Sequence, residues 1–122
     1  MATKKEFTTK RPTYLSAWYR DNLPDSSSGL LITDIDWLFF NHITKRFMLI
    51  EEKTNGAQVA FPQSKIFTFL HNVILEGIKN NADYQYMGFH TIVFENTTFE
   101  DGKCFWDNEE ITADELIAKL SI

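Results

Sequence analysis

The sequence predicts a mixed α/β or α+β domain, in which helices flank a mixed sheet with a central β-hairpin. Segments with the apolar spacing of helices alternate along the chain with shorter runs rich in β-branched and aromatic residues. Hydrophobic residues make up 43% of the 122 residues and include 11 Phe. This is enough apolar material for one core without disulfide bonds or a structural metal.

The N-terminal residues predict an arm followed by a helix. Residues 1–12 are polar and basic and end at a proline, so we expect a flexible arm before a single domain over residues 13–122. Residues 13–23 place tyrosine, leucine and tryptophan side chains at helical spacing, and Pro24 ends this helix. The segment 24–29 (PDSSSG) then predicts a polar loop.

Two strand-like runs follow, over residues 30–41 and 46–54, on either side of the polar turn 42–45. This arrangement predicts a β-hairpin. Both faces of its strands carry apolar residues, so we expect the hairpin to lie inside a sheet that helices cover. Asn55-Gly56 predicts the turn that ends the second strand.

The remainder of the chain predicts a helix, two strands and a last helix. The helix over residues 62–79 is expected to bury an apolar stripe against the sheet. That stripe consists of Ile66, Phe69, Leu70, Val73 and Ile74. Strands are expected over residues 83–95 and 103–106, and Thr112 with Glu115 forms a capping-box signature for the last helix. The single cysteine lies among apolar neighbours, so we expect a buried, reduced packing residue.

Four charged residues interrupt the otherwise apolar hairpin: Asp34, Asp36, Glu51 and Lys53. A buried charge is costly unless it is paired or bound to a metal. A four-residue turn over residues 42–45 places Asp36 opposite Glu51, and Asp34 opposite Lys53. Strand alternation then directs all four side chains to one patch, and the residue between Glu51 and Lys53 to the other face.

Such a patch suits the hydrolysis of phosphodiesters. Clustered carboxylates, together with water and a phosphate oxygen, form a hard-oxygen site for Mg²⁺ or Mn²⁺. The ion would polarise the phosphorus centre and lower the pKa of an attacking water. A lysine beside it can orient that water or stabilise the charged transition state. The structural alternative is a solvated hairpin edge on which these residues form ordinary surface ion pairs.

An aspartate followed by apolar residues (Asp36) and then an acid-x-Lys triplet within residues 49–53 (LIEEK) resembles a known motif. It is similar to that of the PD-(D/E)XK nuclease superfamily, which includes restriction endonucleases, Holliday-junction resolvases and phage nucleases. The resemblance implies a restriction-endonuclease-like fold, with Asp36, Glu51 and Lys53 as the catalytic trio and both acids as metal ligands. Many relatives carry another Glu in the first helix, which this chain lacks. Either Asp34 replaces that acid as a metal ligand, or the site is partial.

Five further residues are candidates for contacts to nucleic acid. Gln63, early in the helix after the motif, resembles a glutamine that some relatives place near the active site. Lys45 and Arg46 in the hairpin turn, Lys65 on that helix and Arg20 in the first helix are candidates for phosphate contacts. A solvated surface is the alternative for these basic residues. The three histidines have no partner at metal-ligand spacing, so we expect surface or packed residues.

The sequence therefore predicts a metal-dependent nuclease that hydrolyses duplex, branched or single-stranded DNA, as a homodimer if two sites must act together. The alternative is a non-catalytic adaptor that binds nucleic acid or protein and keeps a nuclease-like fold. The net charge of −5 argues against tight binding of nucleic acid through charge alone. The N-terminus lacks the apolar segment of a signal peptide, and no apolar run approaches the roughly 20 residues of a membrane span. We therefore expect a cytoplasmic protein without a membrane partner.

Overall fold

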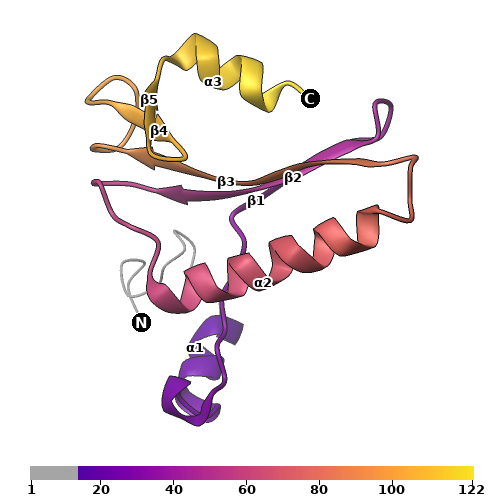
Figure 1. Ribbon diagram of the computed structural model, residues 1–122. Coiled ribbons are helices and arrows are strands. Elements are labelled where there is room, and N and C mark those ends of the chain that lie inside the picture. The colour runs from indigo at the N-terminus through magenta and orange to yellow at the C-terminus, as the bar shows by residue number, and fades with distance from the viewer. Residues whose placement is uncertain (1–13) are drawn as a thin grey trace. The chain divides into compact units, whose positions relative to one another are not determined.

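The computed structural model describes residues 14–122, which fall into two compact units, residues 14–34 and 35–122. The first unit contains helix α1 (Tyr14–Asn22) and the 3-10 helix η2 (Ser26–Ser28) (Figure 1). The helix predicted over residues 13–23 is therefore confirmed. The arm predicted over residues 1–12 lies outside the described residues.

The second unit contains five strands in a single mixed sheet, which confirms the predicted mixed α/β or α+β class. The prediction of a central hairpin is wrong, because β1 is an outer strand of this sheet. The strands are β1 (Trp37–Asn41), β2 (Arg46–Lys53), β3 (Gln85–Phe94), β4 (Cys104–Trp106) and β5 (Glu109–Ile111). They lie side by side in chain order. Strands β2 and β3 run parallel, whereas the other neighbouring pairs are antiparallel. Parallel neighbours need a long crossover, which here contains helix α2 (Phe61–Ile78).

The hairpin of β1 and β2 has the predicted register but a shorter first strand. Trp37 pairs with Ile50 and Asn41 with Arg46, so the four-residue turn over residues 42–45 is confirmed. Residues 30–36 were also predicted to be strand, and that prediction is wrong. Aspartate is unfavourable in strands. The Asp36 side chain accepts a hydrogen bond from the Glu52 amide of β2, over 2.8 Å.

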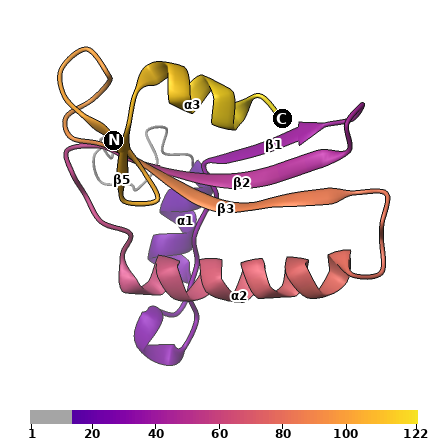
Figure 2. The same ribbon diagram turned by 45° about the horizontal axis from the view of Figure 1, so that its top comes forward.

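Helices α2 and α3 (Ala113–Leu120) cover opposite faces of this sheet (Figures 1 and 2). The main core lies on the α3 side, where alternate residues of β2 meet β3, β4, β5 and α3. Its buried members are Met48, Ile50, Ile92, Cys104, Trp106, Ile111 and Leu116. The predicted burial of the single cysteine is thus confirmed. The intervening residues of β2, including Leu49 and Glu51, lie on the α2 side.

Helix α2 occupies the predicted segment, but it presents a different face to the sheet. Gln63 and Phe67 are its buried residues, and the Phe67 ring lies 4.5 Å, centroid to centroid, from that of Phe89 in β3. The prediction that Phe69 and Val73 are buried is wrong, because these side chains are 68% and 50% exposed. The helix is apolar over more than half of its circumference, so apolar spacing does not decide which side packs.

The C-terminal part contains one strand that the sequence pattern did not predict. Strand β5 pairs with β4 across a turn at Asp107 and Asn108, which both have positive φ angles, of 49° and 72°. Two consecutive positive φ angles are typical of the tight turns that join hairpin strands. The predicted capping box of Thr112 and Glu115 is present at the start of α3. Over the described residues, no helix is both long and apolar enough to cross a membrane.

Candidate active site

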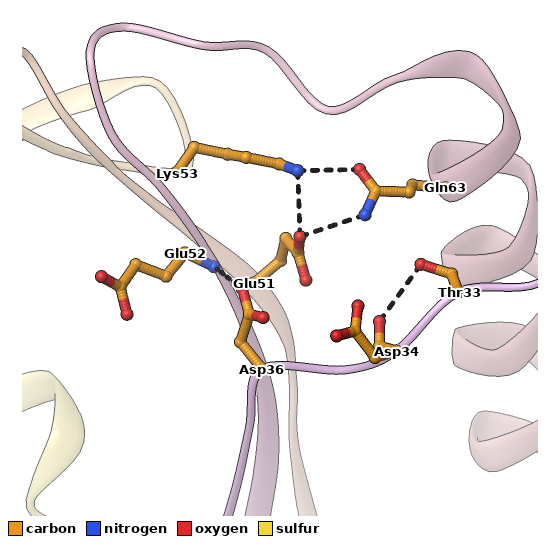
Figure 3. A network of polar contacts seen from close by, with 7 residues as sticks. All are labelled: Thr33, Asp34, Asp36, Glu51, Glu52, Lys53 and Gln63. Atoms are coloured by element: carbon orange, nitrogen blue, oxygen red, sulfur yellow. Dashed lines mark hydrogen bonds and ion pairs between the residues drawn. The ribbon is translucent and has the colours of Figure 1, made fainter. Parts of the chain in front are cut away.

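Four polar side chains of the second unit meet where strand β2 faces the start of helix α2 (Figure 3). Glu51 and Lys53 come from β2, and Gln63 comes from the first turns of α2. Asp36 stands immediately before β1, next to the position that pairs with Ile50. The structure therefore brings together the predicted trio of Asp36, Glu51 and Lys53, and adds Gln63 to it.

Glu51 is the most deeply buried charged residue of this cluster, with 2% of its surface exposed. Burial raises its pKa to about 7, and the nearby negative charge of Asp36 contributes to the rise. Lys53 acts in the opposite direction, through a hydrogen bond and its positive charge. Among the described residues, the Glu51 Oε1 atom has no hydrogen-bond partner. A buried carboxylate oxygen without a partner is costly and calls for an explanation.

Lys53 and Gln63 hold the other oxygen of Glu51. The Lys53 Nζ lies 3.1 Å from Glu51 Oε2 and donates a hydrogen bond to Gln63 Oε1 over 2.8 Å. The Gln63 Nε2 donates to Glu51 Oε2 over 3.3 Å. An ammonium has three N–H donors. Within residues 14–122, Glu51 and Gln63 take two of those of Lys53, which leaves a third for a water or phosphate oxygen.

Asp36 is held by the backbone of the neighbouring strand. Its Oδ2 accepts the hydrogen bond from the Glu52 amide, so the carboxylate is fixed beside Glu51 by the hairpin itself. The Glu52 side chain points to the opposite face, as predicted, where its Oε1 accepts a hydrogen bond from Trp37 Nε1 over 2.9 Å. The register of the hairpin therefore decides which of the two adjacent glutamates joins the cluster.

The other predicted site residues are divided between the two units. Asp34 is the last residue of the first unit, and its backbone carbonyl accepts a hydrogen bond from the Thr33 hydroxyl over 3.2 Å. Arg20 also belongs to the first unit, in α1. Lys45 and Arg46 are exposed at the turn of the hairpin, at the end of β2 opposite to Lys53. Lys65 is exposed on α2. Of the basic residues in the second unit, none is brought into the cluster, because Lys45, Arg46 and Lys65 are exposed outside it.

The carboxylates fit part of a site for a hard divalent cation. Asp36 and Glu51 supply oxygen ligands of the type that Mg²⁺ and Mn²⁺ prefer, and Oε1 of Glu51 is not used by any described residue. No group of three or more His, Cys, Asp or Glu side chains suited to a metal occurs in residues 14–122. Because Mg²⁺ usually keeps several water ligands and is held by one or two carboxylates plus substrate phosphates, two acids are sufficient.

A second charged pair, between His90 and Asp107, was missed by the sequence analysis. The ring nitrogens of His90 lie 2.7 Å from Asp107 Oδ2 and 2.7 Å from the Met87 carbonyl oxygen. Burial lowers the pKa of His90, but these two hydrogen bonds outweigh it and raise the pKa overall. The His90 ring also stacks on Trp106, with centroids 4.5 Å apart. His90 is therefore a packed histidine, one of the two alternatives expected from the sequence.

Comparison with known proteins provides relatives but no activity. No family model matches the sequence, and no solved structure matches it. One similar protein, an uncharacterized protein of Archaeoglobus fulgidus, is 27% identical over 96 residues, which cover 78% of this chain. The chain spans 62% of the length of that relative. A second uncharacterized protein of Archaeoglobus fulgidus is 22% identical over 144 aligned residues, which cover 100% of this chain and 94% of the relative.

Proposed function

We propose that the protein is a metal-dependent nuclease of the PD-(D/E)XK type that hydrolyses phosphodiester bonds of DNA. The observation that carries this proposal is the buried Glu51, whose Oε1 has no partner among the described residues and whose pKa is raised to about 7. A carboxyl that is desolvated and crowded by a second acid gains most from a cation. Such perturbed groups concentrate at functional sites.

Each residue of the cluster has a distinct role in this proposal. Asp36 and Glu51 would hold Mg²⁺ or Mn²⁺, which supplies charge neutralisation and an activated water when it is bound. Lys53 directs its remaining N–H toward a water or phosphate oxygen and stabilises developing negative charge. Gln63 positions the Lys53 ammonium, because its side-chain oxygen accepts one N–H while its amide holds Glu51.

The order of elements supports the restriction-endonuclease-like fold as part of the proposal. The β1–β2 hairpin carries Asp36 and the acid-x-Lys triplet of residues 51–53. Helix α2, which follows, packs on the face of the mixed sheet to which Glu51 and Lys53 point. A DNA substrate agrees with the cytoplasmic location expected from the sequence. A homodimer would supply two such sites for cutting both strands of a duplex or a branched substrate.

The proposal is tested by measuring cleavage of plasmid, single-stranded and branched DNA with Mg²⁺, Mn²⁺ or EDTA. We expect cleavage that requires the metal and falls by about 100-fold or more in Lys53→Ala, which removes a group acting on the transition state. Lys119→Ala serves as a matched control, because this exposed lysine lies on α3, on the opposite face of the sheet from the cluster. Equal cleavage by Lys53→Ala and wild type would contradict the proposal.

Metal binding is tested separately by thermal melting. Mn²⁺ should raise the melting temperature of the wild-type protein by mass action, and Asp36→Asn should abolish this gain. An equal response to Mn²⁺ in both proteins, with no cleavage of any substrate, would favour the non-catalytic adaptor. Two observations favour this second candidate: the acidic net charge of −5, and the absence, over residues 14–122, of a group of three or more side chains suited to a metal.

A further inference from the structure

An open apolar groove of about 340 Å³ lies between helix α2 and the hairpin strands. Its lining consists of Leu38, Phe40, Phe47, Leu49, Leu70, Ile74 and Tyr84. The side formed by β1 is the most open, because Leu38 and Phe40 are 63% and 52% exposed. Strand β1 is also an edge of the sheet that the described residues form. Contiguous exposed apolar surfaces often mark ligand-binding grooves or interaction sites.

Aromatic rings and a cation meet at the turn end of this groove. The rings of Phe40 and Tyr84 are stacked, with centroids 6.3 Å apart. The Nζ atom of Lys45 lies 5.7 Å from the centre of the Tyr84 ring, and the adjacent Arg46 is exposed as well. Exposed aromatic rings beside basic side chains are the two elements with which proteins bind single-stranded nucleic acid, through base stacking and phosphate contacts.

The groove and the candidate active site share one face of the sheet. Phe47, Leu49 and Glu51 alternate along β2 onto the α2 side, so the floor of the groove continues into the cluster. Glu51 lies four positions along the strand from Phe47, which corresponds to about 13 Å. A chain of nucleotides lying in the groove would therefore reach Glu51 and Lys53 at one end and the basic turn at the other.

We propose that this groove binds an unpaired stretch of DNA and leads it to the cluster, so that the substrate is single-stranded DNA or a single-stranded branch. This inference rests on the proposed nuclease function. A duplex hides the faces of its bases and presents phosphates and polar base edges, for which an apolar lining has almost no partners. Unpaired bases expose apolar faces. The net charge of −5 further disfavours binding that depends on phosphate contacts alone.

The experiment measures binding without cleavage. Fluorescence anisotropy in EDTA compares a labelled single-stranded oligonucleotide with a duplex of the same length, for wild type and variants of the whole chain. We expect tighter binding of the single strand, and a loss of about tenfold in Phe40→Leu, which keeps apolar bulk but removes the ring. Phe40→Tyr should retain binding, and Lys45→Gln should reduce its salt dependence. The exposed Phe69, outside the groove lining, provides the control Phe69→Ala.

The outcomes separate this inference from the nuclease proposal. Unchanged binding in Phe40→Leu, or tighter binding of the duplex, overturns the inference even if Mn²⁺-dependent cleavage is present. Binding that depends on Phe40 in a protein that cleaves nothing supports the groove and refutes the nuclease. If the protein binds no oligonucleotide but self-associates, and Leu38→Glu abolishes that self-association, the groove binds a second copy of this chain and the inference is overturned.

Discussion

The buried carboxyl of Glu51 predicts a pH dependence of stability that Glu51→Gln should remove. The unfolded chain releases this proton near pH 4.5, whereas the folded protein holds it until about pH 7. Between these values the folded state binds more protons, so the free energy of unfolding falls as the pH rises. The loss is complete above pH 7 and amounts to about 1–3 kcal/mol. Gln is uncharged and of nearly the same size, so its contribution does not change with pH.

Urea unfolding in EDTA at pH 5 and pH 8 measures this effect. The free energy of unfolding of Glu51→Gln, relative to wild type, should increase by about 1–3 kcal/mol from pH 5 to pH 8. His90 titrates in both proteins, so its contribution cancels in the difference. Glu110→Gln is the control, because that glutamate is exposed on β5. If the difference in unfolding free energy between Glu51→Gln and wild type is the same at both pH values, the assignment of a buried carboxyl with a raised pKa is refuted.

Three further predictions concern the fold. Phe67→Ala should destabilise the protein by about 3–5 kcal/mol in chemical unfolding, because it removes a buried ring from the sheet, whereas Phe69→Ala should stay within about 1 kcal/mol; similar losses would contradict the observed face of α2. His90→Gln should cost more stability at pH 5.5 than at pH 9. The pKa of His90 is raised in the folded protein, so its protonated ring contributes stability at low pH that is lost as the pH rises above this pKa. A cost that does not depend on pH would argue against a charged His90–Asp107 pair. Thr112→Ala should cost about 0.5–2 kcal/mol and lower the helix signal at 222 nm on heating; an unchanged midpoint would contradict a stabilising capping box.

The features that the sequence predicted well are those that depend on neighbours along the chain. The hairpin register follows from the length of its turn, so the placement of Asp36 beside Glu51, and of Glu52 on the other face, could be predicted before the structure. The capping box of α3 involves residues three positions apart and was equally predictable. Gln63 was harder, because its hydrogen bonds to Lys53 and Glu51 depend on how α2 is placed over β2.

Other features depend on tertiary structure and left only weak signals. The two consecutive positive φ angles at Asp107 and Asn108 mark the β4–β5 turn, and the Asp-Asn pair could have indicated it. The bond between His90 and Asp107 joins β3 to that turn across 17 positions, which no local pattern predicts. The start of β1 at Trp37 was also not predictable from local sequence, because the preceding Asp36 binds the Glu52 amide through its side chain.

The error on helix α2 has a physical cause that bears on the proposed substrate. Apolar spacing identifies side chains that could be buried, but the sheet can cover only one side of a helix. Phe69 and Val73 were therefore predicted to be buried with Leu70, although only Leu70 of the three lines the groove. The hairpin also carries more apolar side chains than the fold buries, since Leu38 and Phe40 stay exposed on an edge strand. Natural edge strands are usually protected by charge, proline or a covering element. Apolar surface remains exposed on the β1 wall of the groove, where Leu38 and Phe40 lie on the same face of the sheet as the buried carboxyl of Glu51. This exposure supports the proposed ligand with apolar faces.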